Sequence, residues 1–199
     1  MMPIHRILFP TLLCAGLVGG SSLRALPVDF TPKPYEYHFD GATFHGVKLI
    51  HGDERISYIL PLGWKCWGDR NTLSMRLPEA VGNAWAEISH KENTPPPTWD
   101  QEGIDALLKR ALALLPPVAQ EVKLIEVCKN PLQMRGHDTI RFNFTGQMMA
   151  QSYQFIVVLL PLEDEQFGFV MYGEKKDYES AATSFMSSLG SLRWEKAGP

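Results

Sequence analysis

The chain has 199 residues, of which 45% are hydrophobic, 21% charged and 11% aromatic, with a formal net charge of −3. This composition is typical of a globular protein, and the length is that of a single domain. Lys and Arg never occur in runs longer than two in a chain that is acidic overall, so no basic face is available to displace counterions from phosphates, and we expect no nucleic-acid partner.

Residues 1–25 have the three parts of a secretory signal peptide. A short basic start, "MMPIHR", is followed by the apolar run "ILFPTLLCAGLVGG" and by "SSLRA", which predicts cleavage after Ala25. The apolar run is too short and too interrupted to span a bilayer, so the mature form is expected to have no stable membrane span. Leu13 before Cys14 argues against a lipid anchor. We therefore expect an exported protein, periplasmic or extracellular.

The next segments predict a linker and a hairpin. Residues 26–34 contain three prolines and predict an extended linker. Residues 35–50 predict a β-hairpin with Asp40–Gly41 as its turn. One face of this hairpin is polar and carries Glu36, His38, Thr43 and His45. The other face is expected to belong to the core and carries Tyr35, Tyr37, Phe39 and Phe44.

Apolar periodicity beyond the hairpin predicts further strands and two helices. The strands are expected at residues 55–60, 71–77, 83–90, 122–128, 138–144, 152–160 and 167–173. The continuous run "FIVVLL" in 152–160 predicts a central strand buried on both faces. Thr98 and Gln101 predict a capping box for the first helix, which Pro116–Pro117 end. Asp177 is expected to cap the second helix, which Gly190 ends.

This order of elements predicts the fold class. Many strands and only two helices leave no crossover helix for a parallel sheet. We therefore expect a single-domain α+β sandwich, in which a mostly antiparallel β-sheet is covered by two main helices.

Three stretches, in this order and spacing, resemble the PsbP-like family. They are "ISYILPLGW" (56–64), "MRGHDTIRFNF" (134–144) and "FMSSLGSLRW" (185–194). The family includes the extrinsic PsbP protein of photosystem II, a nuclear Ran-binding protein and exported bacterial relatives. The resemblance covers residues 35–195 and implies a PsbP-like domain with a buried Trp64 and a docking or assembly role. It supplies no catalytic residue that can be carried over to this chain.

The two cysteines of the mature chain are Cys66 and Cys128. Outside the cytosol they could form a disulfide, and without a C-x-x-C pair they predict neither a thioredoxin-like motif nor a four-ligand zinc site. Cys66 is expected on the same strand face as Trp64, which would make it a buried thiol. Cys128 shares its strand face with Glu126, so a bridge requires a bulge. The sequence is consistent both with a bridge and with two separate thiols.

Few other residues point to chemistry. Glu36, His38 and His45 could reach one metal ion from the polar hairpin face, although a solvated face would look the same. Glu163–Asp164–Glu165 could bind calcium, but too few oxygens flank it, and a solvated turn is the simpler interpretation. The turn at residues 146–151 carries two methionines.

The two methionines of this turn, Met148 and Met149, are candidate contacts for a partner protein, unless one of them packs back onto the sheet. The segments His51–Glu54 and Gly136–Asp138 contain His–acid pairs on loops. Neither pair lies beside a motif that presents a nucleophilic serine or cysteine.

The function predicted from these observations is that of an exported, non-catalytic accessory protein that binds, or assists the assembly of, another extracytoplasmic protein. We expect no enzyme activity and no cofactor. The alternative is a small-ligand or metal carrier that uses the cleft beside the hairpin, and a hydrolase is a third interpretation with no motif behind it.

Overall fold

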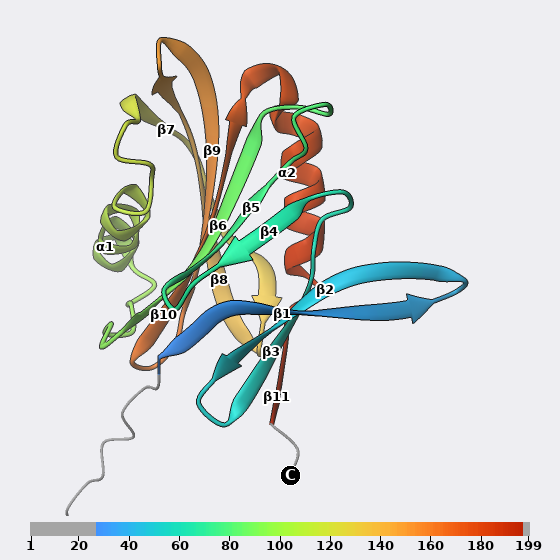
Figure 1. The fold of residues 1–199 in the computed structure, drawn as a ribbon. Helices are drawn as coiled ribbons and strands as arrows, with labels where there is room; N and C mark the ends of the chain where they lie inside the picture. The colour runs from blue at the N-terminus through green and yellow to red at the C-terminus, as the bar shows by residue number, and fades with distance from the viewer. Residues whose placement is uncertain (1–26, 197–199) are drawn as a thin grey trace, which may run out of the picture.

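Two antiparallel β-sheets of unequal size form the body of the protein (Figure 1). The computed structural model describes residues 27–196, so the predicted signal peptide, residues 1–25, lies outside the described residues. The smaller sheet has four strands in the order β1-β2-β3-β11, and the larger has seven in the order β4-β5-β6-β10-β9-β8-β7. With two helices, this is the α+β sandwich that the sequence predicts.

The seven strands predicted beyond the hairpin correspond to β3 and β5 to β10, and most of them are longer than predicted. The strands are β1 (Val28–Phe39), β2 (Ala42–His51), β3 (Glu54–Ile59), β4 (Lys65–Gly68), β5 (Thr72–Arg76), β6 (Ala84–Glu92), β7 (Gln120–Met134), β8 (His137–Met148), β9 (Gln151–Pro161), β10 (Glu165–Glu174) and β11 (Arg193–Lys196). The helices are α1 (Gln101–Leu112) and α2 (Lys175–Leu189).

The predicted linker is largely part of the domain. Residues 28–34 form the first half of β1, and the side chains of Val28 and Phe30 are buried in the core. β1 is an edge strand, where a proline need not interrupt a ladder, and the register shifts between Asp29 and Lys33, around Pro32. The linker prediction was wrong because burial of the alternating apolar side chains, rather than the proline content, determines the structure of this segment.

The β1–β2 hairpin has the predicted register. Glu36 pairs with His45, and the turn is formed by Asp40 and Gly41, with φ of 48° and 76°. Positive φ at both central residues is the requirement of the two-residue turn that matches the twist of a hairpin.

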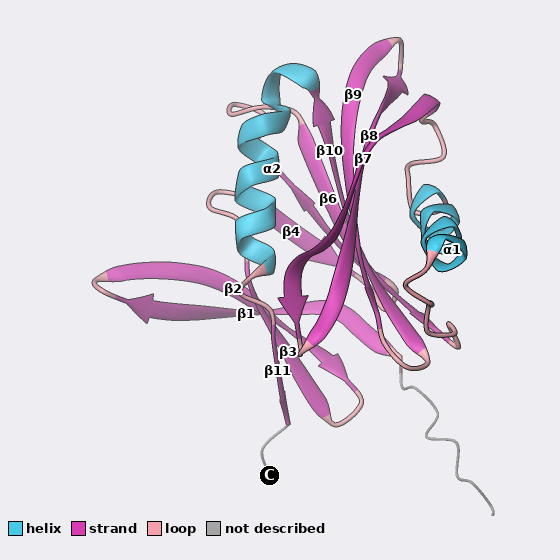
Figure 2. Cartoon of the chain, turned by 180° about the vertical axis from the view of Figure 1, so that it is seen from behind, coloured by secondary structure: helices cyan, strands magenta, loops and turns pink. Residues whose placement is uncertain are grey.

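The tip of this hairpin projects away from the rest of the protein (Figure 2). β3 pairs with β2 only from Gly46 onward, so residues 36–45 extend past the sheet, and Tyr35, which pairs with Gly46, is half-buried. Tyr37 and Phe44 are consequently 45% and 38% exposed. The prediction that this aromatic face belongs to the core was wrong, and the side chain of Phe39 lies outside what the structure describes.

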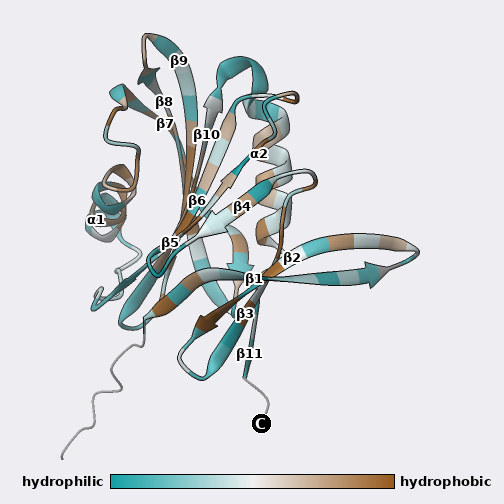
Figure 3. Ribbon diagram, in the orientation of Figure 1, coloured by the Kyte–Doolittle hydropathy of each residue, from teal (hydrophilic) through white to brown (hydrophobic). Residues whose placement is uncertain are grey.

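The two helices cover opposite faces of the larger sheet (Figures 1 and 2). Alternate residues of β9 divide between two core clusters: Phe155 and Val157 pack with residues of α1, and Ile156 and Val158 pack with residues of α2. β9 is therefore buried on both faces, as its continuous apolar run predicts. Both helices of the described residues carry hydrophilic as well as hydrophobic side chains (Figure 3), and neither could span a bilayer.

Both helix caps differ from the predicted ones. Asp100 caps α1, because its Oδ1 accepts a hydrogen bond from the Gly103 amide at 2.9 Å, while the Thr98 hydroxyl donates to the same oxygen. α2 begins before Asp177, whose Oδ2 instead accepts from the Asn83 amide at 2.8 Å. In both cases the side chain that was predicted as a cap makes another polar contact instead, Thr98 with Asp100 and Asp177 with Asn83.

Candidate functional site

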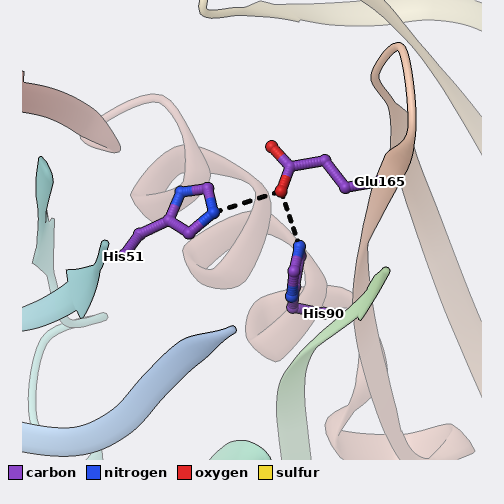
Figure 4. Close-up of side chains that lie close together, drawn as sticks. All are labelled: His51, His90 and Glu165. Carbon is purple, nitrogen blue, oxygen red and sulfur yellow. Dashed lines mark hydrogen bonds and ion pairs between the residues drawn. The ribbon is translucent and has the colours of Figure 1, made fainter. Parts of the chain in front are cut away.

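Three buried polar side chains meet where the two sheets join (Figure 4). His51 ends β2 in the smaller sheet, while His90 on β6 and Glu165 at the start of β10 belong to the larger sheet. Glu165 Oε2 lies 2.8 Å from His90 Nε2 and 3.1 Å from His51 Nε2. The side chains of His90, His51 and Glu165 are only 4%, 9% and 9% exposed. We call these residues the His–Glu–His cluster.

Strand alternation places each member of this cluster toward the core. Buried residues precede the two histidines at the same parity, and buried phenylalanines follow the glutamate. The runs are Val47, Leu49 and His51; Ala86, Ile88 and His90; and Glu165, Phe167 and Phe169. A polar residue at a core-facing position near the end of a strand is the sequence signal that could have identified the cluster. The sequence analysis did not recognise this signal at His90 or Glu165.

Mutual interactions determine the protonation of the cluster. Burial alone raises the pKa of Glu165, but the hydrogen bonds and charges of the two histidines outweigh it and hold the pKa at about 2. The hydrogen bond to Glu165 raises the pKa of His51. The cluster therefore favours a carboxylate that accepts from imidazole N–H groups.

One nitrogen of the cluster has no hydrogen-bond partner. His51 Nδ1 is buried without such a partner, and Glu54 Oε2 is the nearby carboxylate oxygen at 3.8 Å. The other oxygen of Glu54 accepts from Arg135 at 2.6 Å. Buried polar atoms without partners are uncommon, so this one needs an explanation.

Aromatic rings enclose the His–Glu–His cluster. The ring centroid of Phe167 lies 4.8 Å from that of His90 and 5.9 Å from that of His51. Trp194 on β11 lies edge-on to Phe167 at 5.8 Å. An apolar enclosure strengthens the electrostatic interactions within it, so the cluster is suited to holding a proton or an ion.

A groove beside the projecting hairpin is the second candidate site. It has a volume of about 480 Å³, within the range of ligand-binding pockets. Residues from the β2 tip, the β3–β4 segment and α2 line it: Thr43, Phe44, His45, Ile59, Leu60, Pro61, Leu62, Gly63, Trp64, Ser184, Ser187, Ser188 and Ser191. We call it the hairpin groove. Trp64 is 6% exposed, in line with the burial that the resemblance implies, while Leu62 at the same groove is 90% exposed.

The three predicted metal candidates lie together on the hairpin tip. Glu36 Oε2 is 3.9 Å from His38 Nε2, and Glu36 Oε1 is 3.8 Å from His45 Nδ1. The three side chains are between 58% and 72% exposed, and His38 Nδ1 already contacts the Thr43 hydroxyl at 3.0 Å. A solvated ion pair network accounts for this arrangement.

We expect the double variant His38→Ala, His45→Ala to retain the melting temperature and metal content of the wild type. The reason is that both imidazoles are solvated and exposed ion pairs contribute about 0–1 kcal/mol. Thermal unfolding and elemental analysis of the purified protein check this. A metal-dependent loss of several degrees would contradict it.

The two methionines of the predicted turn have different surroundings. Met148, the last residue of β8, is 7% exposed and packs in the core on the α1 side. Met149 has a positive φ in the turn and is 91% exposed. Of the two, Met149 alone is therefore placed to contact a partner.

A bridge between Cys66 and Cys128 is contradicted by the topology. Cys66 lies on β4 and Cys128 on β7, at opposite edges of the seven-stranded sheet, and both are free thiols. A disulfide needs Cα atoms about 4.4–6.8 Å apart, less than the width of two strand spacings. Cys66 packs partly against the core and is half-buried rather than fully buried.

The acidic residues and the His–acid pair predicted on loops differ in their exposure to solvent. Glu163 and Asp164 are exposed, as the solvated-turn interpretation predicts, but Glu165 points inward and that interpretation was wrong for it. His137 and Asp138 are exposed at the start of β8.

Comparison with known proteins identifies the fold. The solution structure of CyanoP, the cyanobacterial PsbP of Synechocystis, matches with a TM-score of 0.51 and 11% sequence identity, covering 90% of this chain and 98% of that chain. PA94 of Pseudomonas aeruginosa, a protein of unknown function, matches with a TM-score of 0.47 and 14% identity, covering 80% and 96%. No family model and no curated protein match the sequence. The chain has a PsbP-like fold, and the likeness extends to the fold alone.

Proposed function

We propose that this chain is an exported, non-catalytic accessory protein that binds an extended, apolar segment of another extracytoplasmic protein in the hairpin groove. The observation that carries the proposal is a strand edge beside an apolar groove. Residues 42–44 of β2 run past the end of β3 and past Leu60, which bonds to His45, and no other described strand pairs with their outer edge.

The backbone of this edge points the right way for strand addition. The carbonyl of His45 accepts a hydrogen bond from the Leu60 amide at 3.1 Å, so the backbone groups of His45 face away from β1. Because these directions alternate along an antiparallel strand, the backbone groups of Thr43 face the same side. An extended peptide laid along residues 42–44 could continue the ladder beyond Leu60, as in other domains that bind peptides by adding a strand.

The lining of the groove indicates what such a peptide would contain. It includes no Asp, Glu, Lys or Arg, so it favours an uncharged segment. The side chains of Phe44, Leu62 and Trp64 offer apolar contact, and serines of α2 line the same groove. A peptide with alternating apolar side chains satisfies both requirements, because its alternate residues face the groove.

The serines of the groove support a binding role over hydrolysis. Ser188 Oγ lies 2.6 Å from the Tyr58 hydroxyl and donates to the Phe185 carbonyl. Ser191 Oγ accepts from the Ile59 amide at 2.9 Å. These hydroxyls stabilise the junction of α2 and β3, whereas a nucleophile needs a base within hydrogen-bond reach.

The double variant Phe44→Asp, Leu62→Asp is expected to lose its partner without losing its fold. Both side chains are exposed, so the charges should not disturb the core, but they would oppose an apolar segment in the groove. The experiment is reciprocal co-purification from the native host, with the partner identified by mass spectrometry and folding followed by thermal unfolding.

Ile125→Asp is the matched control, because Ile125 is 63% exposed on β7, at the far edge of the larger sheet. This variant should keep the partner. Equal loss in both variants, or retention in both, would place binding elsewhere.

The volume of the hairpin groove also favours a second candidate function, the carriage of a small apolar ligand. A carrier recovered from its host should release a stoichiometric small molecule on denaturation. Mass spectrometry of the denatured protein distinguishes the two functions, since a peptide-binding groove releases none.

A further inference from the structure

We infer that His51, His90 and Glu165 form a binding site for one divalent ion of the zinc class, which fastens the smaller sheet to the larger one. Two imidazoles and a carboxylate are a ligand set of this class, since imidazole suits zinc and its transition-metal neighbours and excludes calcium and magnesium. This site is separate from the hairpin groove and from the exposed hairpin histidines.

The three ligand atoms already converge. One ring nitrogen from each histidine and one carboxylate oxygen of Glu165 all lie within 4.8 Å of one another. In a tetrahedral zinc site the ligand atoms stand about 2.0–2.2 Å from the ion, which puts pairs of them about 3.2–3.6 Å apart. The distances of 2.8 and 3.1 Å from the carboxylate oxygen to the two nitrogens need to grow by only a few tenths of an ångström.

The unpartnered nitrogen of His51 is the second, independent observation. When Nε2 of a histidine binds a metal, Nδ1 carries the proton and usually donates it to a carboxylate. His51 Nδ1 is buried without a hydrogen-bond partner and faces Glu54 Oε2 at 3.8 Å. A modest movement of Glu54 would complete a carboxylate–histidine–metal arrangement, with Arg135 fixing the carboxylate from its other side.

The enclosure of the site assigns the ion a structural role. All three side chains are nearly inaccessible, and Phe167 packs against both imidazoles. The three residues leave the fourth position of the ion to a water molecule, and because the surrounding side chains keep that position from a substrate, the ion adds its binding energy to folding. Because His51 ends β2 and the other two ligands lie on β6 and β10, the ion would fix the sheet that carries the hairpin against the rest of the protein.

The test uses the full mature protein, stripped of metal with a chelator and titrated with Zn²⁺, Co²⁺ and Mg²⁺ separately. One equivalent of Zn²⁺ should remain after desalting and raise the melting temperature by several degrees. Co²⁺ should give the intense visible absorption of a four-coordinate site, and Mg²⁺ should do neither. Failure of the wild type to retain Zn²⁺, or an octahedral Co²⁺ spectrum, overturns the inference in favour of a metal-free hydrogen-bonded cluster.

Two sets of histidine variants show which residues bind the ion. His90→Gln should abolish Zn²⁺ retention, whereas the double variant His38→Ala, His45→Ala should retain one equivalent. Retention by the first or loss by the second overturns the assignment. Because His90→Gln can destabilise the fold, ¹⁵N shifts of the histidine side chains are compared in the wild type with and without Zn²⁺. Changes at Nε2 of His51 and His90 support the site, and changes confined to other histidines refute it.

Discussion

Replacement of Glu165 by glutamine is expected to lower the free energy of unfolding of the metal-free protein by about 3–5 kcal/mol, the cost of removing one partner from a buried ion pair. In a chain of this size the melting temperature should fall by roughly 6–20 °C. The physical reason is that Glu165 holds two buried imidazoles through one oxygen, and an amide cannot replace the charge that both of them contact. Thermal and urea unfolding in the presence of a chelator measure the effect.

Glu163→Gln is the matched control, since Glu163 is exposed two residues away and should change stability by less than about 0.5 kcal/mol. The loss in Glu165→Gln should also depend on pH. A carboxyl whose folded pKa is lowered, here from 4.5 to about 2, stabilises the fold above pH 4.5 and loses that contribution as the pH falls toward 2. The gap between wild type and variant should therefore narrow as the pH falls through this window, and a gap that does not narrow would contradict the buried ion pair.

Phe185→Ala is expected to cost a further large amount, about 3–5 kcal/mol. Phe185 on α2 is fully buried, in the core cluster shared by both sheets, and α2 packs against β3, β6, β9 and β10. Truncation would leave a cavity between the helix and the sheets. Because α2 also supplies three of the four serines that line the hairpin groove, partner binding should weaken together with stability.

Ser180→Ala serves as the control for this variant, because Ser180 is exposed on the same helix. Urea unfolding of both variants gives the comparison. A loss below about 1 kcal/mol for Phe185→Ala would mean that α2 is not a main support of the core.

The parts of the fold that the sequence predicted depend on local interactions. Asp40–Gly41 determines the hairpin register, because both residues adopt the positive φ that the turn requires. The apolar run in β9 likewise predicts burial on both faces. Neither pattern needs information about distant parts of the chain.

The failures have a common cause in contacts between distant segments. The face that carries Tyr37 and Phe44 has a core-like pattern, but β3 is too short to continue the smaller sheet beneath it. The His–Glu–His cluster brings together three strands from two sheets, so no spacing within one segment could reveal it. The one local signal of the cluster is a polar residue at a core-facing strand position. For His51 the sequence indicates only a His–acid pair on a loop, with no link to His90 or Glu165.

The possible disulfide illustrates the same limit. Parity along each strand predicted different surroundings for Cys66 and Cys128, whereas both are half-buried, and it could not show that their strands occupy opposite edges of one sheet. Strand order is set by the packing of the whole sandwich rather than by either sequence segment.

The most direct test of strand addition in the hairpin groove is backbone amide hydrogen exchange of the protein with and without its co-purified partner. We expect the outward-facing amide of Thr43 to exchange freely in the isolated protein and to become protected in the complex, because the added peptide strand accepts its hydrogen bond. Amides on β7, around Ile125, should not change. Unchanged exchange at Thr43, together with protection elsewhere, would contradict the proposed mode of binding.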